Sequence, residues 1–167
     1  MNSHVPATNN VSVAAAVFRF SWLYILAAIA VMVIALALEA FFQLDLSKNS
    51  FFGVAPLMAA AMGTGNYYAT RTGTKPSGAK AWLIALISFA LSLAFNLAVI
   101  LGFVFLTDSW QKLGLPSTFR LRGEEQWLVP LVLGVLFLFF VALTRLFLWT
   151  GANPVVKKQR KDATGVF

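Results

Sequence analysis

Four apolar segments separated by short polar stretches dominate the chain. Three of them are long, and each contains at most one charged residue: residues 20–42, 81–107 and 127–150. Each exceeds the roughly 20 apolar residues that an α-helix needs to cross a bilayer. The fourth segment, residues 51–69, is shorter and glycine-rich, and it contains Pro56. The pattern predicts three membrane-crossing helices and a fourth that either crosses or forms a re-entrant loop.

The distribution of charge favours four crossings. With the N-terminus in the cytoplasm, four crossings place the following nine basic residues inside: Arg19, Arg71, Lys75, Lys80, Arg145, Lys157, Lys158, Arg160 and Lys161. Without the crossing at 51–69, the "KKQRK" sequence at 157–161 would be exported, against the positive-inside rule. We therefore expect an all-α membrane protein, with four transmembrane helices in an up-down bundle and both termini cytoplasmic.

The segments at the two ends complete the expected organisation. Residues 1–18 are expected to form a polar cytoplasmic tail, residues 19–150 the membrane domain, and residues 151–167 a basic cytoplasmic tail. A cleaved signal peptide is an alternative interpretation of the first apolar segment, with "ALA" at 35–37 as the cleavage site. Against it, the segment exceeds the roughly 7–15 apolar residues usual in a signal peptide, and no Lys or Arg precedes Arg19. Cleavage would leave the orientation of the later helices unchanged, so charge does not exclude it.

Small residues recur every four positions in the second segment. One series is Ala55, Ala59 and Gly63, and the other is Ala61, Gly65 and Ala69. Four-residue spacing keeps side chains on nearly one helix face. Small side chains on such a face allow membrane helices to approach closely. The segment is therefore predicted to be the packing centre of the bundle. The "GTGN" sequence at 63–66 lacks the strand and the longer glycine pattern of a phosphate-binding loop.

Polar residues inside the apolar segments are the candidate functional groups. Ser88, Ser92 and Asn96 form a stripe with four-residue spacing in the third segment. Such a stripe either joins helices by hydrogen bonds or lines a path for a solute, and the first role is the more common one. Glu39 and Arg145 are charged residues near opposite ends of their segments. Both can extend to the nearer membrane surface, and Glu39 is also a candidate functional charge.

Composition excludes most catalytic chemistry. The chain is 59% hydrophobic and 11% charged, contains no Cys, and has His4 in the N-terminal tail as its only His. Cysteine nucleophiles, thiolate metal sites and histidine-held haem or zinc are therefore excluded. The apolar segments also lack a pair of carboxylates. We expect no enzymatic activity, no metal and no cofactor.

The net charge of +7 points to a membrane surface rather than to nucleic acid. The basic residues lie at the edges of the apolar segments, whereas nucleic-acid binding needs a basic folded face. The "VVKKQRK" sequence at 155–161 is a basic cluster next to a membrane segment, which is typical of attraction to anionic lipid. The expected partners are therefore the bilayer, with anionic lipid at its cytoplasmic face, and no nucleic acid.

The layout resembles a family of small bacterial inner-membrane proteins of similar length. The resemblance rests on the four apolar segments, the small-residue second segment and the "TRTGTKPSGAKAW" loop at 70–82. It implies four membrane crossings and a place in the bacterial inner membrane. The family has no established function, so the resemblance implies no site residues.

Two functions fit these observations. The preferred one is a structural or accessory helix-bundle protein that assembles with itself or with a membrane partner. The alternative is a small self-assembling transporter or channel that uses Glu39 or Asn96.

Overall fold

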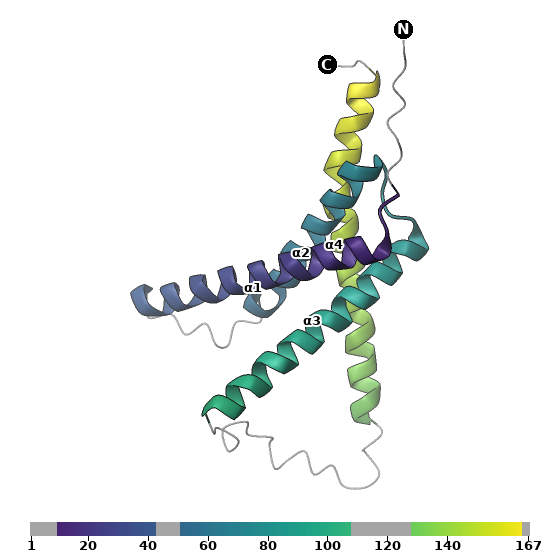
Figure 1. Ribbon diagram of the computed structural model, residues 1–167. Helices are drawn as coiled ribbons and strands as arrows, with labels where there is room; N and C mark the ends of the chain where they lie inside the picture. The colour runs from purple at the N-terminus through teal and green to yellow at the C-terminus, as the bar shows by residue number, and fades with distance from the viewer. Residues whose placement is uncertain (1–9, 43–50, 108–127, 165–167) are drawn as a thin grey trace.

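The computed structural model describes residues 10–42, 51–107 and 128–164, and four helices account for almost all of them (Figure 1). They are α1 (Val13–Phe42), α2 (Phe51–Thr72), α3 (Gly78–Thr107) and α4 (Leu128–Thr164). No strand occurs in these ranges. The expected all-α class is therefore confirmed for the described part of the chain.

Local signals explain where the helices begin and end. The Ser12 hydroxyl accepts a hydrogen bond from the Ala15 amide at 3.1 Å, which caps the start of α1. Gly73 follows α2 with a positive φ of 71°, and its amide donates to the Ala69 carbonyl at 2.8 Å. This left-handed glycine ends the helix. At the other end of the chain, α4 continues through Pro154 to Thr164, so most of the predicted basic tail is helical.

Three of the four helices have the length and apolar composition of membrane-spanning helices. They are the helices that contain Val13–Phe41, Gly78–Leu106 and Pro130–Asp162. These three helices indicate an integral membrane protein. The shorter helix α2 is not among them.

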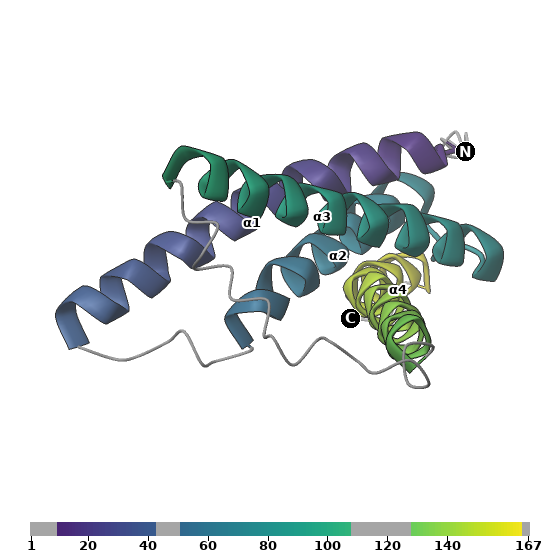
Figure 2. The same ribbon diagram turned by 90° about the horizontal axis from the view of Figure 1, so that it is seen from below.

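The helices are arranged around α2, which packs mainly against α4 and α1. The third helix packs against α4 and α1, and it touches α2 only briefly. Figure 2 shows α4 nearly end-on, whereas α1 and α3 are seen from the side. Neighbouring helices therefore cross at wide angles, and the predicted up-down bundle is not confirmed.

The core lies at one end of the molecule. Its buried residues come from the first turns of α1, from α2, from the first half of α3 and from the middle of α4. Prominent members are Phe20, Tyr24, Ile84, Val141 and Leu148. Beyond this end the helices diverge (Figure 1). Backbone-to-backbone contact through glycine is found at the α2–α4 crossing, at Gly65 and Gly151, and not at Gly102 or Gly134 in the diverging portions.

The diverging portions of α1, α3 and α4 are three apolar arms. We define them as residues 29–41 of α1, 93–106 of α3 and 131–139 of α4. Most of the large side chains in these arms are exposed, for example Leu97 at 57% and Leu133 at 62%. A water-soluble protein rarely exposes apolar surface on this scale. Lipid or other protein must therefore cover the arms.

Candidate functional site

At the crossing of α2 and α4, glycines allow the two helix backbones to touch. A Cβ atom on Gly65 would overlap the Leu148 carbonyl oxygen and lie 2.8 Å from its carbonyl carbon. Conversely, a Cβ atom on Gly151 would overlap the Met62 carbonyl oxygen and lie 2.7 Å from that carbonyl carbon. The two glycines therefore let each helix place its backbone directly on the other.

The two small-residue series of α2 have different surroundings. In the second series, Ala61, Gly65 and Ala69 are all buried. In the first series, Ala55 and Gly63 are half-buried and Ala59 is exposed. A Cβ atom on Gly63 would meet only the end of the Leu23 side chain of α1, at 2.7 Å. The first series does not form one continuous buried face.

Two buried threonines accompany the crossing. Thr64 of α2 and Thr144 of α4 are fully buried. Each hydroxyl donates at 2.8 Å to a carbonyl of its own helix, Thr64 to Ala60 and Thr144 to Phe140. Because both side chains are fully buried and both hydroxyl protons are used within their own helices, neither hydroxyl can donate to a solute in this arrangement.

The polar stripe of α3 faces α1 through one strong contact. The Asn96 amide donates to the Tyr24 hydroxyl of α1 at 2.6 Å and to the Ser92 carbonyl at 2.8 Å. The Ser92 hydroxyl donates to the Phe89 carbonyl at 2.8 Å. The hydroxyl of the fully buried Ser88 has no hydrogen-bond partner among the described residues. Asn96 therefore joins two helices, whereas Ser88 joins none.

A pocket of ≈190 Å³ lies between α1 and α3 beside the Tyr24–Asn96 contact. Aromatic and aliphatic side chains supply most of its lining, with Ser21 and Ser92 as the small polar members: Phe20, Ser21, Tyr24, Ile25, Leu91, Ser92 and Phe95. The pocket contains no charged side chain. It can hold an apolar group, but it offers no acid, base or nucleophile pair for catalysis.

The two charged residues of the apolar segments, Glu39 and Arg145, have separate environments. Arg145 lies with its guanidinium carbon 4.8 Å from the ring centre of Trp82 and 5.8 Å from that of Trp149. The guanidinium group of Arg145 therefore contacts aromatic rings and does not simply extend to the membrane surface. Glu39 is exposed near the end of α1. The partners suggested for Glu39 by sequence, Lys48 and residues 119–125, lie outside the described residues.

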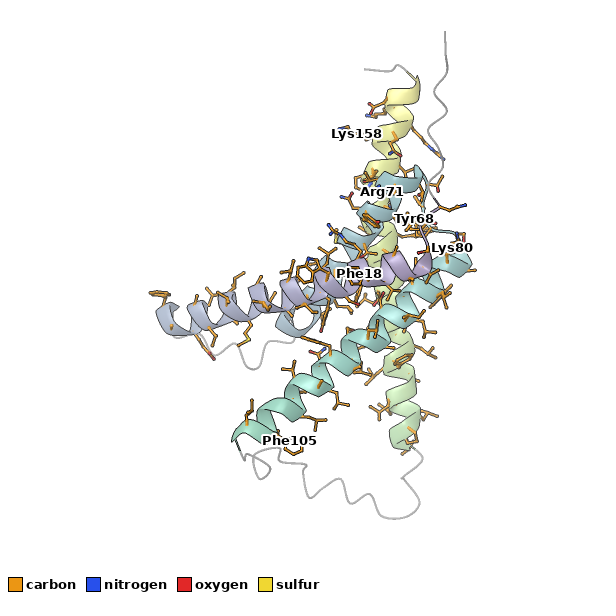
Figure 3. The ribbon with its side chains drawn as sticks, viewed as in Figure 1. Phe18, Tyr68, Arg71, Lys80, Phe105 and Lys158 are labelled. Carbon is orange, nitrogen blue, oxygen red and sulfur yellow. The ribbon has the colours of Figure 1, made fainter. Side chains whose placement is uncertain are left out.

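Cations and aromatic rings gather where α1 begins, α2 ends, α3 begins and α4 approaches its C-terminus. Figure 3 shows Tyr68 and Arg71 at the end of α2, Lys80 at the start of α3 and Lys158 farther along α4. Lys75, in the loop between α2 and α3, lies 4.9 Å from the ring centre of Trp149. Figure 3 also shows Phe105 at the distant end of α3. We call the region where these cations and aromatic rings gather, far from Phe105, the basic end of the molecule.

Sequence reasoning missed three important residues. Gly151 contributes as much to the α2–α4 crossing as Gly65, but no small residue lies four positions before or after it. Tyr24 gave no signal because its partner comes from a distant segment. Trp149 was also missed, but it could have been found from sequence, because it follows Arg145 by four residues and therefore lies on the same helix face.

No metal-binding group of three or more His, Asp or Glu side chains occurs among the described residues. Comparisons of the chain with protein-family models, with curated proteins and with solved structures gave no match. The site is therefore interpreted from its own geometry.

Proposed function

We propose that this chain is a non-catalytic membrane protein that assembles through its helices, either with itself or with a membrane partner. The observation that carries the proposal is the contrast between the compact core and the three exposed apolar arms. The arms diverge instead of packing on one another, so their surfaces are available to other helices. The α2–α4 crossing would serve as the rigid scaffold that holds the arms apart.

The proposed topology has four crossings, with both termini in the cytoplasm of a bacterial inner membrane. Although α2 contains no candidate membrane span, its 22 residues extend about 33 Å, comparable with the hydrocarbon thickness. Its polar groups also pack partly against α1 and α4. A green fluorescent protein fused after Phe167 tests this orientation. A fluorescent fusion supports a cytoplasmic C-terminus. A second fusion at the same position carries alkaline phosphatase, which is active only in the periplasm, and activity of that fusion would contradict this orientation.

The natural absence of cysteine allows a direct test of assembly. Single cysteines replacing Leu97 on the α3 arm and Leu133 on the α4 arm would carry a benzophenone photo-crosslinker in native membranes. Leu83→Cys, at an exposed position on the core end of α3, is the matched control. We expect protein crosslinks of defined mass from the arm positions and none from Leu83→Cys. Crosslinks to lipid alone from both arm positions would refute the proposal.

A small transporter or channel is the second candidate. It is favoured by the Ser88 hydroxyl, which has no partner within the described ranges, and by the Tyr24–Asn96 contact beside the pocket between α1 and α3. It predicts that Glu39→Gln or Asn96→Leu abolishes solute flux in proteoliposomes without lowering membrane abundance. Flux that persists in both variants would eliminate it.

A further inference from the structure

Two arginines from different helices flank one aromatic ring at the basic end. The guanidinium carbons of Arg19 on α1 and Arg71 on α2 each lie 5.8 Å from the ring centre of Tyr67. The two cationic groups are therefore separated by no more than twice that distance. Both arginines are exposed, and Tyr67 is half-buried between their helices.

The positive charge of this pair is not balanced by a carboxylate in the described part of the chain. Glu39 and Asp162 are the acidic residues in those ranges, and neither arginine has an ion-pair contact there. Glu39 follows Arg19 by 20 residues on the same helix, which corresponds to about 30 Å. Two exposed like charges near one ring repel each other weakly in water, and an anion in contact with both would offset that repulsion.

A phosphate group is an anion that fits these donors. The planar guanidinium group offers paired N–H donors that match the spacing of phosphate oxygens, and such charge-assisted hydrogen bonds are among the stronger ones. An ammonium group at the same positions would bind as a point charge without this geometry.

The position of the pair points to lipid as the source of the phosphate. Tyrosine rings with a polar tip prefer the headgroup level of a membrane, and Tyr67 and Tyr68 both lie in the last turns of α2. Phe18, next to Arg19 in α1, is 76% exposed. An exposed phenyl ring beside an exposed guanidinium group is expected where acyl chains meet headgroups.

We propose that Arg19 and Arg71, positioned on either helix beside Tyr67, bind the phosphate of an anionic phospholipid headgroup. The bound headgroup would link the start of α1 to the end of α2. The inference requires membrane insertion, but it is independent of whether the protein assembles with itself or with a partner. It differs from a diffuse attraction to the basic tail because it assigns the lipid to two residues.

Native mass spectrometry of the full-length protein in detergent, titrated with phosphatidylglycerol or phosphatidylcholine, tests this site. The double variant Arg19→Gln/Arg71→Gln removes both guanidinium groups. The matched control, Lys157→Gln/Lys158→Gln, removes the same charge from the exposed end of α4. The control measures the diffuse attraction of the basic tail to anionic lipid, and we expect the arginine variant to lose about tenfold more phosphatidylglycerol affinity than the control. Equal losses in the two variants would overturn the site.

Two further arms complete the test. Arg19→Lys and Arg71→Lys keep the positive charge and are less liable to disturb folding than the glutamine variants. Each should lose part of the preference for phosphatidylglycerol over phosphatidylcholine. Full retention in both would overturn the bidentate geometry. Inorganic phosphate should not displace the lipid at equal concentration. If it does, the ligand is free phosphate and the lipid assignment is wrong.

Discussion

Replacing Gly65 by alanine adds one methyl group where the backbone of α2 meets the backbone of α4. The added carbon would lie 2.8 Å from the Leu148 carbonyl carbon and 3.1 Å from its Cα atom. Because these are backbone atoms, no side chain can rotate to make room. Restoring an ordinary carbon–carbon contact of about 3.5–4.0 Å requires the helices to separate by about 1 Å.

The separation should lower the free energy of unfolding by about 1–3 kcal/mol, the usual range for overpacking. That range corresponds to about a 5- to 140-fold change in the folding equilibrium. Gly151→Ala should cost a similar amount, because its methyl group would meet the Met62 backbone. The two substitutions disturb one crossing, so the double variant should lose less than the sum of the single losses.

Reversible unfolding in mixed micelles, driven by increasing sodium dodecyl sulfate and followed by circular dichroism, measures these changes. Gly134→Ala on α4 is the matched control, since nothing lies within 4 Å of its added carbon. The control should be neutral or more stable, because alanine favours helix by up to about 1 kcal/mol over glycine. Gly63→Ala should cost less than Gly65→Ala, because it meets only the flexible Leu23 side chain. If Gly65→Ala is as stable as Gly134→Ala, the proposed backbone contact is wrong.

The same unfolding assay checks three further predictions. Asn96→Leu should cost about 0.6–2 kcal/mol through the lost hydrogen bond to Tyr24, and Tyr24→Phe should add little to that variant. If the double variant loses the sum of the two single losses in stability, the contact between Asn96 and Tyr24 is wrong. Ser88→Ala should be neutral or stabilising, since it removes a buried hydroxyl without a described partner; a clear loss would reveal a hidden partner. Arg145→Gln should cost about 0.5–2 kcal/mol and change tryptophan fluorescence, because Trp82 loses its cation. Unchanged fluorescence would count against that contact.

The apolar segments could be predicted from sequence because membrane-crossing helices need long uninterrupted apolar stretches. Their angles could not, since periodicity identifies a helix face but not the element that covers it. Thus the series Ala61, Gly65 and Ala69 could be recognised as small, but its meeting with α4 at Leu148 depends on the tertiary structure. The role of Gly151 is harder still to predict, because in the sequence a single glycine without regular spacing looks the same as a glycine that makes no close contact.

The polar contacts show the same limit. Asn96 in an apolar segment must find a partner, so a contact could be expected from physical chemistry. The choice of Tyr24 required the approach of α1 and α3 in space. Arg145 was expected to extend to the membrane surface, and the structure adds Trp82 from α3, a residue distant in sequence.

The mass of the complex in its own lipids shows whether the protein assembles. The full-length protein would be extracted from membranes in polymer-bounded native discs, and its mass and components determined by mass spectrometry. Assembly predicts either a multiple of the 18.2 kDa chain or a stoichiometric complex with a second membrane protein. A single 18.2 kDa chain surrounded only by lipid would contradict it.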